Sequence, residues 1–360
     1  MRYTGLIILL VLCLTLLLLT GCIVNTVIPE TAIGNLGNQE DINQSSNNSQ
    51  NSSAGSVEEP VIENTEEPVM WSGLGMGLFL SDESYIDTML ANGFEQLRID
   101  IPNYQATWLE QSKAVVITAI SKGAEVIWGV SSNDFNNPDY TITAENWATY
   151  RQAILDNAQW AQDNGVFEFQ LGNEEELHID GTTMTVAQII TNLKSVATNV
   201  KAIFTRGNIS YSCAVAFMDD WISEGKGDID ILACNIYCGG DDQYNDDWKT
   251  RITNLVNAFG VNGTYLTEFN LSGTSLEDYS TDEEVQATAL TEMIDYIKAS
   301  GITRALYFMW KDDGDAHYGV VKADETYRLL WNQALLNTGP VKSTTVLATA
   351  KPDTIALMPK

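Results

Sequence analysis

Two glutamates are candidates for chemistry because each comes at or near the end of an apolar run. The run FEFQLGN leads directly into Glu174, and the run TYLTEFN contains Glu268. Two carboxyl groups that face one another can cleave a glycosidic bond: one is protonated and serves the leaving group, and the other is ionised and attacks. Glu174 opens a Glu-Glu-Glu run, which alone is more typical of a solvated face, so its candidacy depends on the pairing with Glu268.

The elements that must position these glutamates follow a repeating pattern. Short apolar runs alternate with longer helical patterns, which is typical of βα units and a parallel sheet. The expected strands are residues 74–79, 96–101, 125–130, 167–172, 209–214, 229–237, 264–269 and 304–310. Helical patterns include residues 145–164, 186–204, 246–259 and 283–299, several of them followed by a glycine that ends the helix.

Eight such units predict a (β/α)8 barrel, an α/β fold, over residues 70–338. That length suits a fold that typically needs about 250 residues. In such a barrel the ends of strands four and seven place Glu174 and Glu268 across the mouth, at the rim where barrel enzymes carry their active sites. The rival architecture is an open doubly wound sheet, as in solute-binding lipoproteins. No Gly-rich phosphate loop follows the first expected strand, which favours the barrel.

Residues at other strand ends carry a resemblance to a known group of enzymes. In chain order, with the two glutamates, they are Arg98, Asn173, Glu174, Tyr237, Glu268 and Trp310. Their order and placement on expected strands two, four, six, seven and eight resemble those of clan A glycoside hydrolases, most nearly the family-five cellulases and mannanases. The resemblance covers the whole block from the first strand to the eighth.

The resemblance implies a retaining β-glycoside hydrolase acting on glucan, mannan or xylan without a cofactor or metal. Glu174 would be the general acid/base and Glu268 the nucleophile. Asn173 would hydrogen-bond the sugar 2-hydroxyl, and Arg98 and Tyr237 would keep the nucleophile ionised.

Two further contacts are expected at the end of the barrel. Trp310 would be the apolar platform on which a sugar ring stacks, because an aromatic face suits the C–H surface of a pyranose. His317 would contact the sugar from the loop after strand eight. That loop, residues 311–317, is acidic, but it lacks the terminal glutamate and the spacing of an EF-hand calcium loop. We therefore expect it to be a substrate-contacting or solvated loop.

Two positions depart from the family pattern. Glu175 stands where the family-five enzymes usually have proline, and Asn235, a further expected substrate contact, stands where they usually have histidine. These departures leave open a second hypothesis, a non-catalytic glycan-binding lipoprotein on the same barrel with a decayed site. Release of reducing ends from glycans would distinguish the two.

The charge of the chain limits its partners. The sequence has 19 Lys and Arg against 48 Asp and Glu, a formal net charge of −29. Nucleic acid and anionic lipid bind clustered positive charge, so neither is expected as a partner. An uncharged oligo- or polysaccharide fits better, and we expect a monomer. A zinc site has little support, because the chain has only two histidines.

The cysteines of the expected barrel are Cys213, Cys234 and Cys238. Their odd number leaves at least one thiol unpaired. A disulfide between Cys213 and Cys238 is one alternative, since export permits it. Buried, inert thiols are the other, and we favour them.

The N-terminal part of the chain predicts export and anchoring. Arg2 precedes an apolar run over residues 6–19, and residues 1–21 therefore read as a signal peptide. The sequence LTGC ending at Cys22 resembles a lipobox, which implies lipidation of Cys22 and an extracytoplasmic, membrane-anchored lipoprotein. Residues 22–69, rich in Asn, Ser and Glu, are expected to be a disordered linker. Residues 339–360 form a tail without a clear period.

The lipobox predicts that Cys22→Ala abolishes acylation and membrane retention without harming the fold. Acyl chains hold a protein at a membrane through about 0.8 kcal/mol for each buried methylene, and the variant has no acceptor for them. Metabolic fatty-acid labelling measures the effect. Equal labelling of variant and wild type would show the prediction to be wrong.

Overall fold

In the computed structural model, the described residues are 73–99, 101–132, 141–238, 247–271, 283–312, 319–328 and Leu335. The signal peptide, Cys22, the linker, the tail and His317 lie outside these residues, so the predictions made for them stay predictions. Within the described part, eight parallel strands pair in sequence order and the eighth pairs with the first. This closed barrel confirms the predicted (β/α)8 class and excludes an open-sheet solute-binding fold.

All eight predicted strands are present. They are β1 (Gly73–Leu78), β2 (Gln96–Ile99), β3 (Glu125–Gly129), β4 (Glu168–Asn173), β5 (Ile209–Ala214), β6 (Ile231–Cys238), β7 (Leu266–Leu271) and β8 (Arg304–Tyr307). The eighth ends at Tyr307, whereas the sequence pattern predicted a strand as far as residue 310.

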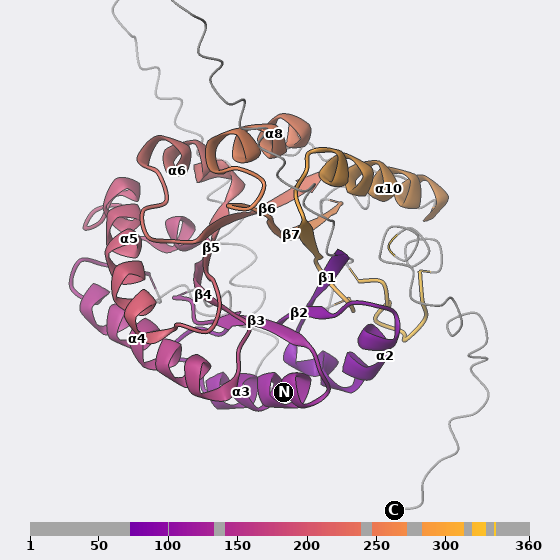
Figure 1. Ribbon diagram of the computed structural model, residues 1–360, viewed down its shortest axis with the longest axis horizontal. Coiled ribbons are helices and arrows are strands. Elements are labelled where there is room, and N and C mark those ends of the chain that lie inside the picture. Colours follow the sequence, from indigo (N-terminus) through magenta and orange to yellow (C-terminus); the bar gives the residue numbers. More distant parts are fainter. Residues whose placement is uncertain are drawn as a thin grey trace, which may run out of the picture. The chain divides into compact units, whose positions relative to one another are not determined.

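Helices surround the strands (Figure 1). They are α2 (Ile86–Ala91), α3 (Leu109–Ser121), α4 (Trp147–Asn164), α5 (Val186–Ile203), α6 (Met218–Glu224), α8 (Trp248–Phe259) and α10 (Glu283–Ala299), with short 3₁₀ turns η1 (Leu80–Tyr85), η2 (Glu175–His178) and η3 (Val215–Phe217). Helix α4 ends at the predicted glycine, Gly165, whose φ of 92° is left-handed and suits a residue without a Cβ. No helix of the described ranges is long and apolar enough to cross a membrane.

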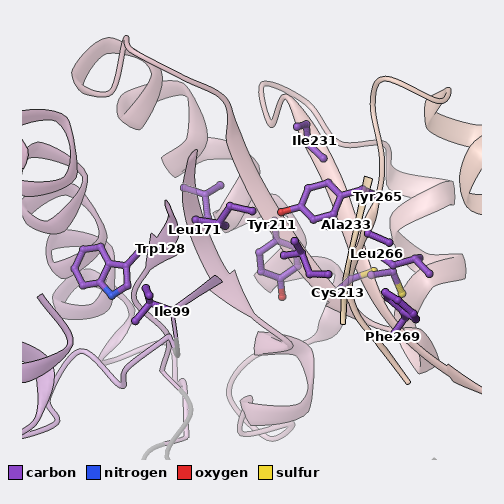
Figure 2. Close-up of a cluster of buried hydrophobic side chains, with 14 of the residues drawn as sticks. Ile99, Trp128, Leu171, Tyr211, Cys213, Ile231, Ala233, Tyr265, Leu266 and Phe269 are labelled. Atoms are coloured by element: carbon purple, nitrogen blue, oxygen red, sulfur yellow. The ribbon is translucent and has the colours of Figure 1, made fainter. Parts of the chain in front are cut away.

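The hydrophobic core lies between the strands and the helices. Figure 2 shows part of it, with Leu171, Tyr211 and Phe269 from three different strands. Trp128 of β3 illustrates how the two layers join: its ring lies 4.9 Å from that of Trp160 in α4, and its indole N–H donates to a serine hydroxyl of α3 at 2.8 Å. Each large side chain buried in this way contributes about 1.5–3 kcal/mol, so the strand positions are strongly fixed.

A cluster of charged and polar side chains is buried at one end of the barrel. Glu168, at the first position of β4, is fully buried and forms an ion pair with Arg304 at the first position of β8. The hydroxyl of Tyr265 donates to Glu168 at 2.6 Å, and the Arg304 guanidinium lies 4.0 Å from the centre of the Tyr265 ring. These three side chains, the basal cluster, fill the barrel at the N-terminal ends of its strands.

The three cysteines of the barrel are buried free thiols. Cys213 of β5 pairs in register with Cys234 of β6. The alternative disulfide between Cys213 and Cys238 is therefore not formed, and the expectation of buried thiols is confirmed.

The basal cluster predicts that Arg304→Met lowers the free energy of unfolding by about 3–5 kcal/mol, because it leaves the Glu168 charge buried and unpaired. Urea unfolding measures the change. The double variant Glu168→Gln with Arg304→Met should recover part of the loss, since it buries no lone charge. A single variant as stable as the wild type would contradict this account of the barrel interior.

Candidate active site

Glu268 is held as a carboxylate by two partners at the barrel mouth. Nη1 of Arg98 lies 2.7 Å from Oε1 of Glu268, and the hydroxyl of Tyr237 donates to Oε2 at 2.5 Å. Arg98 is 5% exposed and Glu268 8%, so this ion pair is only slightly screened by solvent. Each oxygen of Glu268 thus has its own hydrogen-bond donor.

Arg98 also fixes the strand on the other side of the mouth. Its Nε donates to Oε1 of Gln170 at 2.9 Å, and its Nη2 donates to Oδ1 of Asn173 at 2.9 Å. A guanidinium offers its donors in one rigid plane. The three contacts therefore set the positions of Glu268 and Asn173 relative to each other.

Asn173 belongs to a series of linked side-chain hydrogen bonds near the barrel mouth. Its Oδ1 also accepts from Nδ2 of Asn235 at 3.2 Å, and Oδ1 of Asn235 accepts from the hydroxyl of Ser212 at 2.8 Å. The Ser212 hydroxyl lies 2.6 Å from that of Thr267. Because both bonds to Asn173 use its amide oxygen, its amide nitrogen is the group that can donate to a ligand. Asn235 is buried, and in this structure it links other side chains.

Glu174 occupies an unusual backbone conformation directly after β4. Its φ and ψ are 57° and 36°, in the left-handed region that non-glycine residues rarely adopt. Its backbone N–H donates to the carbonyl of Ser212 at 2.8 Å. Its side chain is half-buried and hydrogen-bonds Asn235. The turn therefore brings Glu174 to the same cluster of side chains as Glu268.

The electrostatic environment of Glu174 favours its protonated form. Burial and then the negative charge of Glu268 raise the pKa of Glu174 to about 8. The hydrogen bond from Asn235 opposes this rise, Glu176 adds to it, and the positive charge of Arg98 opposes it. Glu174 is thus protonated at neutral pH beside a carboxyl that is ion-paired with Arg98, an arrangement that suits acid-assisted displacement.

Glu175, the first departure from the family pattern, is completely buried rather than solvated. It accepts hydrogen bonds from Ser131 at 2.8 Å, from the hydroxyl of Tyr150 at 2.7 Å and from both the backbone and the hydroxyl of Ser132. Burial raises the pKa of Glu175, and the hydrogen bonds from Ser132, Tyr150 and Ser131 oppose that rise.

Glu176 is also buried, but it faces a different element. One carboxylate oxygen accepts from the indole N–H of Trp221 in α6, and the other has no hydrogen-bond partner among the described residues. Burial raises the pKa of Glu176 to about 7. Glu175 and Glu176 are buried and Glu174 is half-buried, so this run of glutamates is not a solvated face.

Trp310 does not lie where a sugar platform must be. Its indole is completely buried, with ring centres 6.1 Å from Tyr85, 6.3 Å from Phe94 and 6.3 Å from Tyr327. No face of the ring is open to a ligand, so the expectation of a platform is corrected. The cause is the early end of β8 at Tyr307, after which the alternation of a strand no longer determines where side chains point.

Phe308 is the aromatic residue that the sequence reasoning missed. It is half-buried and follows β8 directly. Its ring centre lies 6.4 Å from that of Tyr237, whose hydroxyl binds Glu268, and 5.9 Å from that of Phe79. The run ALYFMW contains three aromatic residues, and alternation from the inward-facing Arg304 would have selected Phe308 as well as Trp310.

A cavity of about 220 Å³, which we call the side cavity, adjoins the residues that surround Glu175. Its lining residues are Tyr104, Gln105, Ser132, Thr141, Ile142, Asn146 and Tyr150. Ser132 and Tyr150 are the same residues that bind Glu175. The walls combine hydroxyl and amide groups with two tyrosine rings whose centres are 5.2 Å apart, a mixture that suits a small polar ligand with apolar faces.

In the loop after β8, the first aspartate binds other groups of the protein. The carboxylate of Asp312 accepts from two nitrogens of Arg328, at 2.9 and 3.0 Å, and from the backbone N–H of Gly319 at 2.7 Å. Its oxygens therefore bind the chain itself. His317 lies outside the described residues.

Solved structures of glycoside hydrolases share this fold. An exo-β-1,4-mannosidase from Opitutaceae bacterium strain TAV5 is 11% identical with a TM-score of 0.56, and the match covers 74% of this chain and 59% of that longer chain. Cel5A from Thermotoga maritima, solved with cellobiose, is 13% identical with a TM-score of 0.52 over 74% of this chain and 97% of its own. A family 5 xyloglucanase from Paenibacillus pabuli is 12% identical with a TM-score of 0.52 over 75% and 99%.

At these identities the likeness shows the fold, and it agrees with the fold implied by the resemblance of strand-end residues. No protein-family model matches the sequence, and no curated protein matches it either.

The site predicts that Glu268→Gln lowers the pKa of Glu174 from about 8 towards the ordinary carboxyl value. Removing the neighbouring negative charge makes ionisation of Glu174 less costly, while its burial remains. Carbon-13 NMR titration measures the pKa, with Glu174→Gln identifying the signal. Glu176→Gln is the matched control and should cause a smaller drop. An unchanged pKa in Glu268→Gln would show that the two carboxyls do not interact.

Proposed function

We propose that this chain is a retaining β-glycoside hydrolase that cleaves β-linked glycan of the glucan, mannan or xylan type by double displacement. One observation carries the proposal: Glu268 is ion-paired to Arg98, and its charge helps to raise the pKa of Glu174 to about 8. The solved structures with the same fold include a mannosidase, a cellulase and a xyloglucanase by name. Their printed activities support a β-glycan substrate for this chain.

In the first step, a carboxylate oxygen of Glu268 attacks the anomeric carbon of the sugar. The bond from that carbon to the glycosidic oxygen breaks, and the departing oxygen takes the proton of Glu174. Asn173 donates its amide N–H to the sugar 2-hydroxyl, a bond that strengthens in the transition state. Arg98, which binds both Asn173 and Glu268, keeps these two side chains in place beside the reacting carbon.

In the second step, water releases the sugar from Glu268. The ester has no negative charge, so the Coulomb contribution that raised the pKa of Glu174 is removed and Glu174 becomes the carboxylate. It takes a proton from water as the water oxygen bonds to the anomeric carbon and the ester bond breaks. Both carboxyls then return to their starting protonation states.

Two surfaces near the glutamates suit the rest of the substrate. Phe308 offers a half-buried aromatic ring beside Tyr237, where a sugar ring can stack. The side cavity, with Gln105 and Tyr104 on its wall, suits a further sugar unit. Lipidation of Cys22 would hold this domain at the membrane on the linker of residues 22–69, where it can meet extracellular glycan.

We predict that Glu174→Gln lowers the hydrolysis of natural glycan by a factor of about 10² to 10⁴, the usual contribution of a general acid. Activated aryl glycosides need less acid assistance, so their glycosylation step should fall less. For the wild type, kcat/KM should decline as the pH rises through about 8, because Glu174 then loses its proton. Release of reducing ends from β-glucan, mannan and xylan is the measurement. An equal fall for both substrate types would remove Glu174 from the acid role.

We also predict retention of anomeric configuration. Nucleophilic attack needs carboxyls about 5–5.5 Å apart, whereas inversion needs about 6.5–9.5 Å to admit water. Early product NMR should show the configuration of the substrate, and a matched 2-deoxy-2-fluoro glycoside should label Glu268. An inverted first product would overturn double displacement. Binding of glycan by the wild type without release of reducing ends would favour the non-catalytic hypothesis.

A further inference from the structure

Five hydrogen-bond donors surround the carboxylate of Glu175. They are the hydroxyls of Ser131, Ser132 and Tyr150 and the backbone N–H groups of Ser132 and Asn173. Its own backbone N–H donates to the hydroxyl of Tyr211 at 3.0 Å. A completely buried carboxylate is costly unless it is fully hydrogen-bonded, and here the bonds come from several elements. Glu175 therefore joins the end of β3, helix α4 and the turn after β4.

The turn that Glu175 fixes is the one that carries Glu174. A non-glycine residue with positive φ is strained and persists only where its surroundings hold it. On its N-terminal side, Asn173 gives a backbone N–H to Oε1 of Glu175 at 3.2 Å, and Glu174 gives its own to Ser212. On its C-terminal side lies Glu175 itself. The carboxylate of Glu175 thus closes a loop around Glu174.

We infer that Glu175 is the positioning residue of the acid/base: its buried carboxylate fixes the left-handed turn that presents Glu174 to the substrate. The inference rests on the proposed function. Where the family-five enzymes resembled by this chain usually have proline, which restrains the backbone through its ring, this chain uses hydrogen bonds. Glu175 is on this account a replacement for that restraint and not a sign of decay.

Shape and hydrogen bonds, rather than charge, should matter for this role. Glutamine has nearly the same shape, keeps one acceptor oxygen, and can donate from its nitrogen to a serine hydroxyl that rotates to accept. Alanine removes every one of the contacts. A positioning role therefore predicts that Glu175→Gln is mild and Glu175→Ala is severe.

The activity test compares two substrates in each variant. For Glu175→Ala we expect hydrolysis of unactivated β-glycan to fall by about 10-fold or more, because a misplaced Glu174 loses acid assistance worth about 10² to 10⁴. The glycosylation step of a dinitrophenyl glycoside, measured as a pre-steady-state burst, should fall by less than about 3-fold, since that leaving group needs little protonation. Glu175→Gln should stay within about 3-fold of the wild type on both.

Tyr265→Phe is the control for general destabilisation. It loses a 2.6 Å hydrogen bond to Glu168, a glutamate of β4 that is as buried as Glu175 but lies at the far end of the barrel. Its melting temperature should fall while the ratio of the two activities stays unchanged. If Glu175→Ala does not fold, Tyr150→Phe, which removes a 2.7 Å bond to Glu175, should shift the activity ratio in the same direction by a smaller factor.

A second readout is independent of turnover. Carbon-13 NMR titration of Glu174 should show a changed pKa in Glu175→Ala, or in Tyr150→Phe, and the wild-type pKa in Glu175→Gln. If the pKa of Glu174 changes in these variants but the wild type hydrolyses no glycan, the positioning role is supported and the proposed function is wrong.

Three results would overturn the inference. The first is an unchanged Glu174 pKa in Glu175→Ala. The second is an equal loss on both substrates, which a merely structural role would give. The third is a loss of activity in Glu175→Gln as large as that in Glu175→Ala, which would assign the effect to the charge of Glu175 or to proton transfer.

Discussion

The guanidinium of Arg98 is the contact on which the arrangement of the mouth depends. It reaches Glu268 on β7 and both Gln170 and Asn173 on β4 from a single plane. A buried guanidinium is tolerated only when its donors are used, so these strands must stand in one register around it. The closed barrel supplies that register, and the hydrophobic layer between strands and helices supplies the free energy that keeps it closed.

Three consecutive glutamates show how position determines the role of one residue type. Glu174 faces the mouth, Glu175 joins β3 and α4, and Glu176 reaches Trp221 in α6. The left-handed conformation of Glu174 makes this divergence sterically feasible, because it turns the chain sharply between the strand and η2. On the proposed function, the same conformation makes the position of Glu174 depend on side chains that do not touch the substrate.

The fold and the placement of the two glutamates were predictable because they follow from periodicity: strand ends in a parallel barrel meet at one rim. The grouping of Arg98 and Tyr237 with Glu268 was implied by the resemblance to clan A glycoside hydrolases. The position of Trp310 could not be predicted, because it depends on where β8 ends. Strand boundaries are the least certain part of a sequence pattern. The burial of Glu175 could not be predicted from the sequence either. Its partners Ser131 and Tyr150 come from other elements, and no period in the sequence relates them to residue 175.

The pairing of Arg98 with Glu268 has a consequence for charge over the proposed reaction cycle. In the free site, the positive charge of Arg98 is balanced by Glu268, and Glu174 is neutral. In the glycosyl-enzyme, Glu268 is a neutral ester, and an ionised Glu174 balances Arg98 instead. The net charge of this desolvated pocket is therefore the same in both states, and the negative charge only changes residue. Neither half-reaction has to import or expel a counterion, which suits a pocket that turns over uncharged sugars one after another.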